Sequence, residues 1–305
     1  MLKPDLEAVK KTLQKYDFPV DVIVETIAYC NLDCIMCPQP NLQRKRGEMS
    51  FEVFKKIADE IALESAETRL WVAIMGEPLI RAGQLVEMIS YAKNKGVNSV
   101  HLNTNGILMS KEIAKKLIQS GLDEIILGLD AASAETYENI RVNGNYQLLI
   151  QNIDNLLNLK KQLNSSTPRV IVQYIVMDEN ESEVDIFKEY WLSRGAIVKI
   201  RPKLGWGTGV STNLNLPDSE RNFPCPWLTR TVSIHWNGRF AQCDGDYEGQ
   251  YSPGDINKNT IKEIWNGELA ERRKKHWELD FSHTLCSKCK DWQAGRSQFY
   301  YPEGE

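Results

Sequence analysis

Three cysteines lie within eight positions near the start of the chain. Cys30, Cys34 and Cys37 are spaced as C-x3-C-x2-C. Sulfur ligands suit zinc ions and iron–sulfur clusters. A structural zinc ion normally takes four protein ligands, but the nearest histidine, His101, is far along the chain. Three thiolates instead suit a [4Fe–4S] cluster with one open iron, so this spacing predicts an iron–sulfur centre that can bind a further ligand.

Four more cysteines occupy the last third of the chain, at the spacing C-x17-C-x42-C-x2-C. They are Cys225, Cys243, Cys286 and Cys289. Four thiolates brought together from a hairpin and a C-x2-C pair fit a zinc ribbon or a [4Fe–4S] cluster equally well by spacing. The seven cysteines therefore divide into a set of three and a set of four, with no thiol left over.

The composition limits the cellular compartment and the classes of partner that we expect for this chain. The chain has 305 residues, 42% hydrophobic and 26% charged, as in ordinary soluble proteins. The net charge of −4 gives no indication of a nucleic-acid surface, and the basic run 271–276 is expected to be a solvated helix face. Without an apolar signal core or an apolar run of about 18 residues, we expect a cytoplasmic protein with no membrane or nucleic-acid partner. Disulfides are rare there, which favours metal binding by clustered cysteines.

The first three cysteines need a scaffold, and residues 20–204 provide the pattern of one. Short runs rich in Val and Ile alternate there with longer helical patterns. The runs are apolar on both faces, as in the strands of a buried parallel sheet. Six successive βα units predict an α/β fold, a barrel or partial barrel, with Cys30 just after the first strand. The expected strands are 20–28, 69–76, 99–106, 124–131, 169–177 and 196–204.

The pattern changes after this repeat. Residues 1–19 form a charged amphipathic pattern that predicts an N-terminal helix, and residues 20–204 form the barrel. Residues 205–224 are rich in Gly, Asn, Ser and Pro, which predicts a linker. Residues 225–305 are expected to form a small α+β domain. It contains a hairpin that turns at Asn237-Gly238, followed by a helix and a cysteine-containing tail.

The motif around the first cysteines, "AYCNLDCIMCPQP", resembles that of the radical S-adenosylmethionine (SAM) enzymes. Further landmarks of that family follow in order: "MGEP" at 75–78, "NTNG" at 103–106 and "LDAASAETYENIR" at 129–141. The resemblance implies a partial (β/α)6 barrel whose open cluster iron binds SAM. Reductive cleavage of SAM would then give a 5′-deoxyadenosyl radical that abstracts hydrogen from a substrate.

The resemblance also implies which residues contact SAM. Met36 is expected near the adenine, and Glu77 near the SAM amino group. The strand ends carry contacts to the ribose and the methionine carboxylate. Met75 stands where the family usually has glycine, which bears on the geometry of that turn. The expected SAM contacts are Met36, Gly76, Glu77, Pro78, Asn103, Asp130 and Arg141.

The C-terminal stretch "CDGDYEGQYSPGDINKNTIKEIWNGE…CSKC" resembles the SPASM/twitch region of radical SAM enzymes. Four cysteines match the shorter twitch version, which holds one auxiliary [4Fe–4S] cluster. The resemblance thus implies two [4Fe–4S] clusters, one on each cysteine set. An auxiliary cluster with every iron bound by cysteine cannot readily ligate a substrate, but it can accept an electron.

The expected reaction is the oxidation of a carbohydrate or amino-cyclitol alcohol, with the auxiliary cluster as electron acceptor. The size and cysteine layout resemble those of twitch dehydrogenases that act on amino-cyclitols. A flavodoxin or a ferredoxin is the expected reductant. Candidate catalytic or anchoring residues on the carboxyl rim of the barrel are Tyr29, Gln173, Arg201 and Lys203.

Three alternatives remain open at this level. Epimerisation of a sugar or peptide would need a non-cysteine hydrogen donor such as Tyr174 or Tyr247. Modification of a ribosomal peptide is another, although the roughly 19 residues before the first strand are few for a domain that grips a leader peptide. The third is a non-catalytic zinc-binding interaction protein that docks through its C-terminal cysteines.

Overall fold

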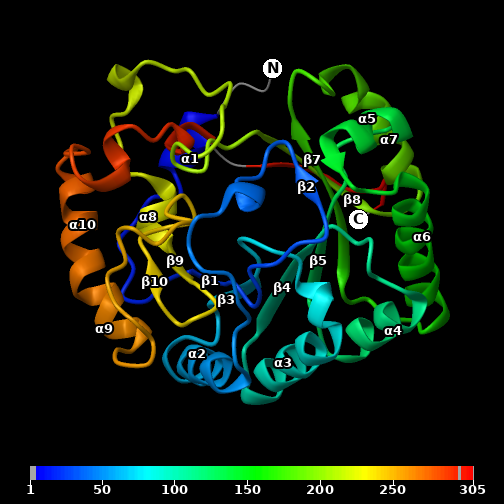
Figure 1. The fold of residues 1–305 in the computed structure, drawn as a ribbon, viewed down its shortest axis with the longest axis horizontal. Helices are drawn as coiled ribbons and strands as arrows, with labels where there is room; N and C mark the ends of the chain where they lie inside the picture. Colours follow the sequence, from blue (N-terminus) through cyan, green and yellow to red (C-terminus); the bar gives the residue numbers. More distant parts are fainter. Residues whose placement is uncertain (1–4, 295–296, 305) are drawn as a thin grey trace.

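The computed structural model describes residues 5–294 and 297–304, and most of their strands form one curved sheet (Figure 1). Among these residues, nine strands pair in the order β10-β9-β1-β3-β4-β5-β7-β8-β11. The predicted α/β fold with a partial (β/α)6 barrel is confirmed. Its six successive parallel strands are β1 (Asp21–Val24), β3 (Arg69–Val72), β4 (Ser99–Thr104), β5 (Glu124–Gly128), β7 (Arg169–Val176) and β8 (Ile197–Pro202).

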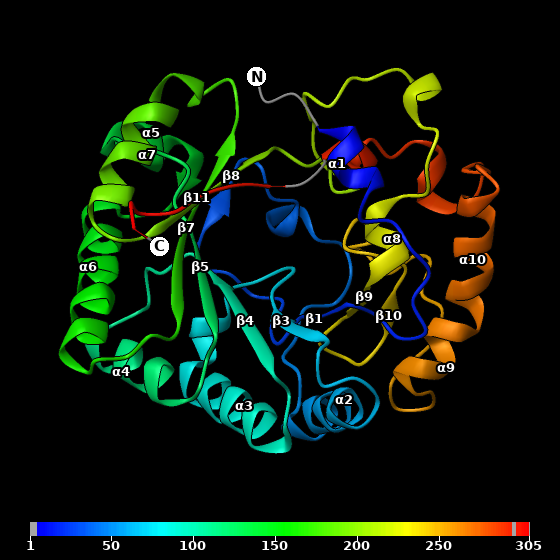
Figure 2. The ribbon, with the colours of Figure 1, turned by 180° about the vertical axis from the view of Figure 1, so that it is seen from behind.

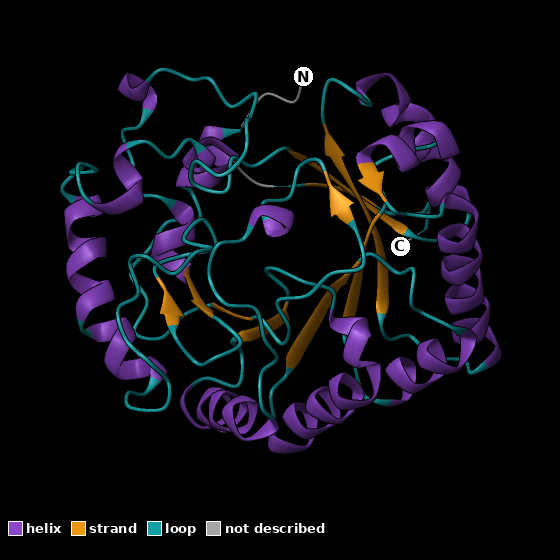
Figure 3. Ribbon diagram, viewed as in Figure 1, coloured by secondary structure: helices purple, strands orange, loops and turns teal. Residues whose placement is uncertain are grey.

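Helices cover the outer, convex side of this sheet (Figures 1 and 3). Ser50 and Ser110 begin two of them, because each side chain accepts a hydrogen bond from a backbone N–H three residues on. Gly96 ends another in the left-handed conformation, at φ 98°. The helices are α2 (Phe51–Glu64), α3 (Ala82–Lys95), α4 (Lys111–Gln119), α5 (Ala134–Ile140), α6 (Tyr146–Gln162) and α7 (Val184–Ser193).

Side chains alternate along each parallel strand between the helices and the interior of the barrel. In β1, Val22 and Val24 are fully buried in the core beneath the helices, whereas Asp21 and Ile23 line an interior cavity. Residues at every second position of β3, β7 and β8 line the same cavity. The sheet therefore carries an apolar layer outside and a partly polar lining inside.

The C-terminal region extends the same sheet at both edges. β9 (Thr231–Ile234) runs parallel to β1, and β10 (Phe240–Ala241) pairs antiparallel with β9. At the opposite edge β11 (Gln298–Tyr300) pairs antiparallel with β8, as Figure 2 shows. The hairpin turns at Asn237-Gly238, where Gly238 has φ 88°. The region expected as a second domain thus shares one sheet with the barrel, and the position of the domain boundary stays a prediction.

Two segments differ from the prediction. The N-terminal helix α1 spans only Leu6–Lys10, and Val9 is its one buried residue. The basic run lies in α10 (Glu268–Trp277), but it is not wholly solvated. Arg273 and His276 are buried, and the Arg273 guanidinium lies 3.6 Å from the ring centre of Trp265 in α9 (Ile261–Asn266). Among the described residues, no helix is long and apolar enough to cross a bilayer.

Candidate functional site

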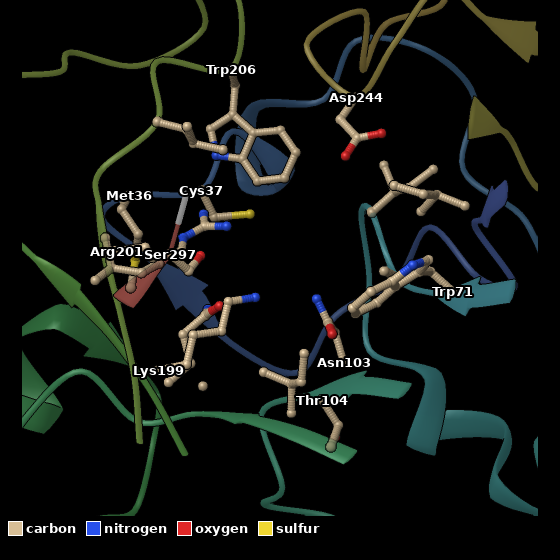
Figure 4. Close-up of a pocket in the computed structure, with 18 of the residues that line it drawn as sticks. Met36, Cys37, Trp71, Asn103, Thr104, Lys199, Arg201, Trp206, Asp244 and Ser297 are labelled. Carbon is tan, nitrogen blue, oxygen red and sulfur yellow. The ribbon is translucent and has the colours of Figure 1, made fainter. Parts of the chain in front are cut away.

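A cavity of about 500 Å³ occupies the interior of the barrel. Its wall includes all three cysteines of the first set, which follow the carboxyl end of β1. Figure 4 shows side chains from several strands and loops, among them Cys37, Asn103, Lys199 and Asp244, around this space. The cavity is therefore the place where a group bound at the cysteines would meet a substrate.

The turn 75–78 packs directly on the cysteine loop. Gly76 has φ 83°, and a Cβ atom there would overlap the Ile27 carbonyl oxygen. The backbone N–H of the next residue, Glu77, donates a hydrogen bond to the backbone carbonyl oxygen of Tyr29 at 2.8 Å. Met75 is buried and has no positive φ, so glycine is required at position 76 and not at position 75. Met75 itself thus needs no left-handed backbone, although Ile74 before it has φ 79°.

A two-stranded ribbon holds the other side of the cysteine loop. β2 (Asp33–Cys34) pairs antiparallel with β6 (Arg141–Val142), which places Cys34 opposite Arg141. The Arg141 Nη1 atom lies 3.6 Å from Cys34 Sγ, and its Nε donates to Asp130 at 3.0 Å. Gly128 leaves room for this guanidinium, because a Cβ atom there would overlap it. Burial lowers the pKa of Arg141, but the Asp130 and Cys34 charges more than offset this, so Arg141 stays cationic.

The three thiols are poor acids without a bound metal. Burial raises the pKa of Cys30 to about 11 and that of Cys37 to about 12. Burial also raises the pKa of Cys34, although Arg141 opposes the shift. Thiolates at these positions thus need further positive charge, which cluster irons supply. Asn105 Nδ2, 3.9 Å from Cys30 Sγ, adds a polar hydrogen beside the sulfur.

Glu77 is buried, and its side chain already accepts three hydrogen bonds from the protein. Its carboxylate accepts hydrogen bonds from the Thr104 hydroxyl, the Asn105 N–H and the Leu79 N–H, at 2.7, 2.7 and 2.9 Å. Burial raises its pKa, and these hydrogen bonds oppose the shift. Glu77 lines the cavity, so it joins the turn 75–78 to the end of β4 beside the space expected for SAM.

The other expected SAM contacts divide between the cavity and its support. Met36, Gly76, Asn103 and Arg141 line the cavity. The Asn103 Oδ1 atom is buried without a hydrogen-bond partner among the described residues. Two of the expected contacts are not part of the lining. They are Asp130, which is fully buried behind Arg141, and Pro78, which begins the short helix η2 (Pro78–Arg81).

The candidate catalytic residues are also divided. Gln173, Arg201 and Lys203 line the cavity, but Tyr29 does not, and its side chain is 45% exposed. Gln173 Oε1 and Arg201 Nε are buried without partners among the described residues.

The two tyrosines considered as hydrogen donors for an epimerase do not line the cavity either. Tyr174 is fully buried beneath the helices and donates to the Asn180 carbonyl at 2.5 Å. Tyr247 lies outside the lining too, with its ring beside Gly209. Neither phenol is thus in reach of a radical formed on a substrate in the cavity.

Several charged cavity residues are missed by the sequence reasoning, and Lys199 and Asp244 bear most on the chemistry. Lys199 precedes Arg201 by two positions in β8, and strand alternation alone could have placed the two on one face. Asp244 follows Cys243 directly, and it accepts a hydrogen bond from the Ser233 hydroxyl. Burial raises the pKa of Asp244 to about 6 and lowers that of Lys199 to about 7, where Arg201 adds to the effect.

The second cysteine set is buried and lies directly behind the cavity wall. Cys225, Cys243, Cys286 and Cys289 are all buried and free of disulfides. Burial raises the pKa of Cys225, Cys243 and Cys289, and the charge of Cys286 raises each of them further. The four sulfurs thus share one site, although their segments lie far apart in the sequence. The neighbours Pro226 and Asp244 line the cavity.

Polar hydrogens surround the sulfurs of this second set. Gln242 Nε2 lies 3.1 Å from Cys286 Sγ, and the Thr284 hydroxyl lies 3.5 Å from the same atom. The Asp291 backbone N–H donates to Cys289 Sγ at 3.4 Å. Donors of this kind stabilise sulfur that carries negative charge, as in an iron–sulfur cluster.

The spacing of the sulfurs separates a cluster from a single zinc ion. Four sulfurs around one zinc at about 2.3 Å would lie about 3.8 Å apart. Within the described parts of the chain, one group of three metal-binding residues has all its ligand atoms within 4.8 Å: His276, His283 and Cys286. No three of the described cysteines meet this criterion. The sulfurs of neither described set thus lie as close together as a single zinc ion requires.

Comparison with known proteins supports this interpretation of the site. The family model described as "Radical SAM superfamily" matches residues 24–190, and that described as "Iron-sulfur cluster-binding domain" (SPASM) matches residues 225–290. A probable GTP 3′,8-cyclase of Methanococcus maripaludis is 31% identical over 172 residues, which are 56% of this chain and 54% of that protein. The mycofactocin maturase MftC of Mycolicibacterium smegmatis is 26% identical over 230 residues, 74% of this chain and 56% of the maturase. The chain thus spans about half the length of these curated relatives.

Solved structures share the fold at low sequence identity. BtrN in complex with AdoMet and 2-DOIA superposes with a TM-score of 0.62 at 16% identity, covering 92% of this chain and 94% of BtrN. Streptococcus suis SuiB bound to precursor peptide SuiA gives a TM-score of 0.70 at 10% identity, covering 92% and 71%. At these identities the likeness establishes the arrangement of strands and helices, and the chemistry must come from the site.

Proposed function

Since this chain belongs to the radical SAM superfamily, we propose that it oxidises an alcohol carbon of a carbohydrate or amino-cyclitol held in the barrel cavity. SAM and a [4Fe–4S] cluster are the cofactors of this superfamily, and the SPASM domain implies additional iron–sulfur binding. When bound, SAM and the first cluster supply the hydrogen-abstracting 5′-deoxyadenosyl radical, and the auxiliary cluster supplies an acceptor for the remaining electron. Cys30, Cys34 and Cys37 would hold the first cluster, and the four C-terminal cysteines the second.

One observation carries this proposal: the first cysteine set lines the cavity and the second lies behind its wall. Cys30, Cys34 and Cys37 belong to its wall, and Pro226 and Asp244 bring the second set directly behind it. A substrate in this space would have a hydrogen-abstracting centre on one side and an electron acceptor on the other. This arrangement supports a net oxidation, since the substrate must lose one electron more than hydrogen-atom abstraction removes.

The chain's own residues would position both reactants. Asp130 fixes the Arg141 guanidinium beside Cys34, where it can meet the SAM carboxylate. Asn103 Oδ1 and Gln173 Oε1 are buried acceptors without partners among the described residues, so they can accept hydrogen bonds from hydroxyl groups. Asn103, an expected SAM contact, would accept a ribose hydroxyl, and Gln173 would orient a substrate alcohol towards the cysteine side of the cavity.

We assign Asp244 as the base that accepts the proton of the substrate hydroxyl group. Its carboxylate lines the cavity, and the one hydrogen bond that it has among the described residues comes from the Ser233 hydroxyl. A carboxylate has lone pairs left to accept a further proton donor. With SAM and both clusters bound, the oxidation would balance: the hydrogen atom would go to the adenosyl carbon, the proton to Asp244 and the electron to the auxiliary cluster held by the four C-terminal cysteines.

A second candidate is the modification of a ribosomal peptide. The sequence similarity to a mycofactocin maturase over 74% of this chain favours it. Both candidates share SAM cleavage at the first cysteine set and differ in what the cavity receives.

The test is anaerobic turnover with cluster-reconstituted, reduced enzyme and SAM. We expect 5′-deoxyadenosine in the wild type and none in a Cys30→Ala variant. With carbon-deuterated sugars or cyclitols as substrates, deuterium should be transferred to 5′-deoxyadenosine while the substrate alcohol is converted to a ketone. Asp244→Asn should lose ketone while it retains 5′-deoxyadenosine. If a precursor peptide, and no sugar or cyclitol, raises turnover, the second candidate replaces the first. Absence of 5′-deoxyadenosine from an iron-loaded wild type would refute both.

A further inference from the structure

Two cations stand side by side on the cavity-facing side of β8. Lys199 and Arg201 are two positions apart in one strand, so their side chains leave the same face. Both line the cavity, and Figure 4 shows both side chains reaching into the space between Cys37 and Asn103. Lys203 continues the row towards the carboxyl end of the strand.

Neither cation is paired within the described parts of the chain. Arg201 Nε is buried without a partner. Lys199 Nζ contacts the Phe299 ring, 5.6 Å from the ring centre. Other cations of the cavity wall do have carboxylate partners: Arg141 pairs with Asp130, and Arg69 and Arg230 both pair with Asp21. The positive charge at this part of β8 is therefore uncompensated by direct contact.

Leaving two like charges unpaired inside a protein is unfavourable. Burial lowers the pKa of both groups, and Arg201 lowers that of Lys199 further, to about 7. Asp130, Asp291 and Asp244 favour the charged form of Arg201, but Asp130 is already paired with Arg141. Ordinary packing would replace such residues by apolar ones, so the pair indicates a ligand of negative charge.

We propose that Lys199 and Arg201 together bind an anionic group of the substrate, a carboxylate or a phosphate ester. This inference rests on the proposed function and narrows its substrate class from carbohydrates and amino-cyclitols in general to sugar or cyclitol derivatives that carry such a group. A planar guanidinium can bind two oxygens of one anion, and the ammonium can bind a third. Gln173 Oε1, on the neighbouring strand opposite Lys199, is left to accept a hydroxyl of the same molecule.

Calorimetric titration of the SAM-loaded holoenzyme with small probes tests this site directly. The probes are inorganic phosphate, malonate and the uncharged malonamide. We expect one of the anions to bind and malonamide not to bind. Lys199→Met and Arg201→Gln should each lower the affinity for the anion by roughly tenfold or more. Arg201→Lys should recover part of this loss. Lys115→Met, which alters an exposed lysine of α4, is the matched control and should change nothing.

The outcomes separate this inference from the proposed function. Tighter binding of phosphate indicates a phosphorylated substrate, and tighter binding of malonate a carboxylate. Equal binding in the wild type and both variants, or no anion binding by the wild type, overturns the site. If both variants lose SAM binding instead, the cations serve SAM, and the inference is wrong. Anion binding that depends on Lys199 and Arg201 supports the site even where 5′-deoxyadenosine formation fails.

Discussion

Arg141 and Cys34 face each other across the β2–β6 ribbon, with the Arg141 Nη1 atom 3.6 Å from the Cys34 sulfur. They are 107 positions apart in the sequence. Asp130 accepts hydrogen bonds from the other side of the guanidinium, so a buried carboxylate, a cation and a ligand sulfur form one row. The row fixes a positive charge beside the iron that the cysteines would hold, where a SAM carboxylate would need it.

Arg141→Met should lower SAM cleavage more than cluster content. The variant removes the cation beside Cys34 but leaves all three thiols, so iron and sulfide per chain should stay near the wild-type values. The rate of 5′-deoxyadenosine formation per cluster should fall about tenfold or more, because a charge-assisted hydrogen bond to SAM is lost. Asp130→Asn, which frees the guanidinium, should give a smaller loss. An unchanged rate in Arg141→Met would show that this row does not act on SAM.

Gly76→Ala should disturb the cysteine loop. The residue has φ 83°, and a Cβ atom would overlap the Ile27 carbonyl oxygen. We expect a loss of more than about 1 kcal/mol in the free energy of unfolding and a lower iron content after reconstitution. Gly83→Ala is the matched control: it lies in α3, and a Cβ atom there meets nothing within 4 Å. Its melting temperature should be equal or higher. Equal iron and stability in both variants would contradict the packing argument.

His276 should affect the auxiliary cluster. Its Nδ1 accepts from the Cys225 backbone N–H at 3.3 Å, so the ring proton is on Nε2, which is buried without a partner in the described residues. Since a ring nitrogen of His276 lies within 4.8 Å of Cys286 Sγ, this N–H can donate to cluster sulfur. Loss of such a donor destabilises the reduced cluster.

His276→Phe should therefore lower the midpoint potential of the auxiliary cluster in an EPR-monitored titration. The potential of the first cluster should not change, and the neighbouring variant Lys274→Gln should leave both potentials as they are. An equal shift of both clusters, or none in either, would mean that the Nε2 proton has another partner.

Lys199→Met should stabilise the fold most at low pH. Burial and the charge of Arg201 lower the Lys199 pKa from 10.5 to about 7, Arg69 also disfavours the charge, and Glu124 and Asp21 favour it. The unfolded chain thus binds more protons than the folded one between these values, and the wild type gains stability as pH rises through this range. The variant's gain in melting temperature, a few degrees, should be full below about pH 7 and gone near pH 10.5. A gain that does not depend on pH would mean that the Lys199 pKa is the same in the folded and the unfolded chain.

The sequence alone determined the elements that are local along the chain. The C-x3-C-x2-C spacing placed three thiols on one loop, and runs of Val and Ile predicted the six parallel strands, because spacing and periodicity act over a few residues. Position at a strand end predicted Arg201 and Lys203 near the site, and period-two alternation along the strand would have added Lys199. Family landmarks in order then indicated SAM and iron–sulfur chemistry.

Only the tertiary structure decided which distant groups meet. β9 joins the edge of the barrel sheet beside β1, so the auxiliary cysteines lie behind the same cavity as the first set. Asp130 turns to Arg141 behind the cavity wall, and Tyr29 faces away from it, although both stand at strand ends. The curvature of the sheet determines which residues far apart in the sequence come into contact. Packing then determines which charged side chains have no partner of opposite charge. Neither the contacts nor the missing partners can be predicted from the spacing of residues along the chain. Only the folded structure therefore shows that Lys199 and Arg201 have no carboxylate partner among the described residues.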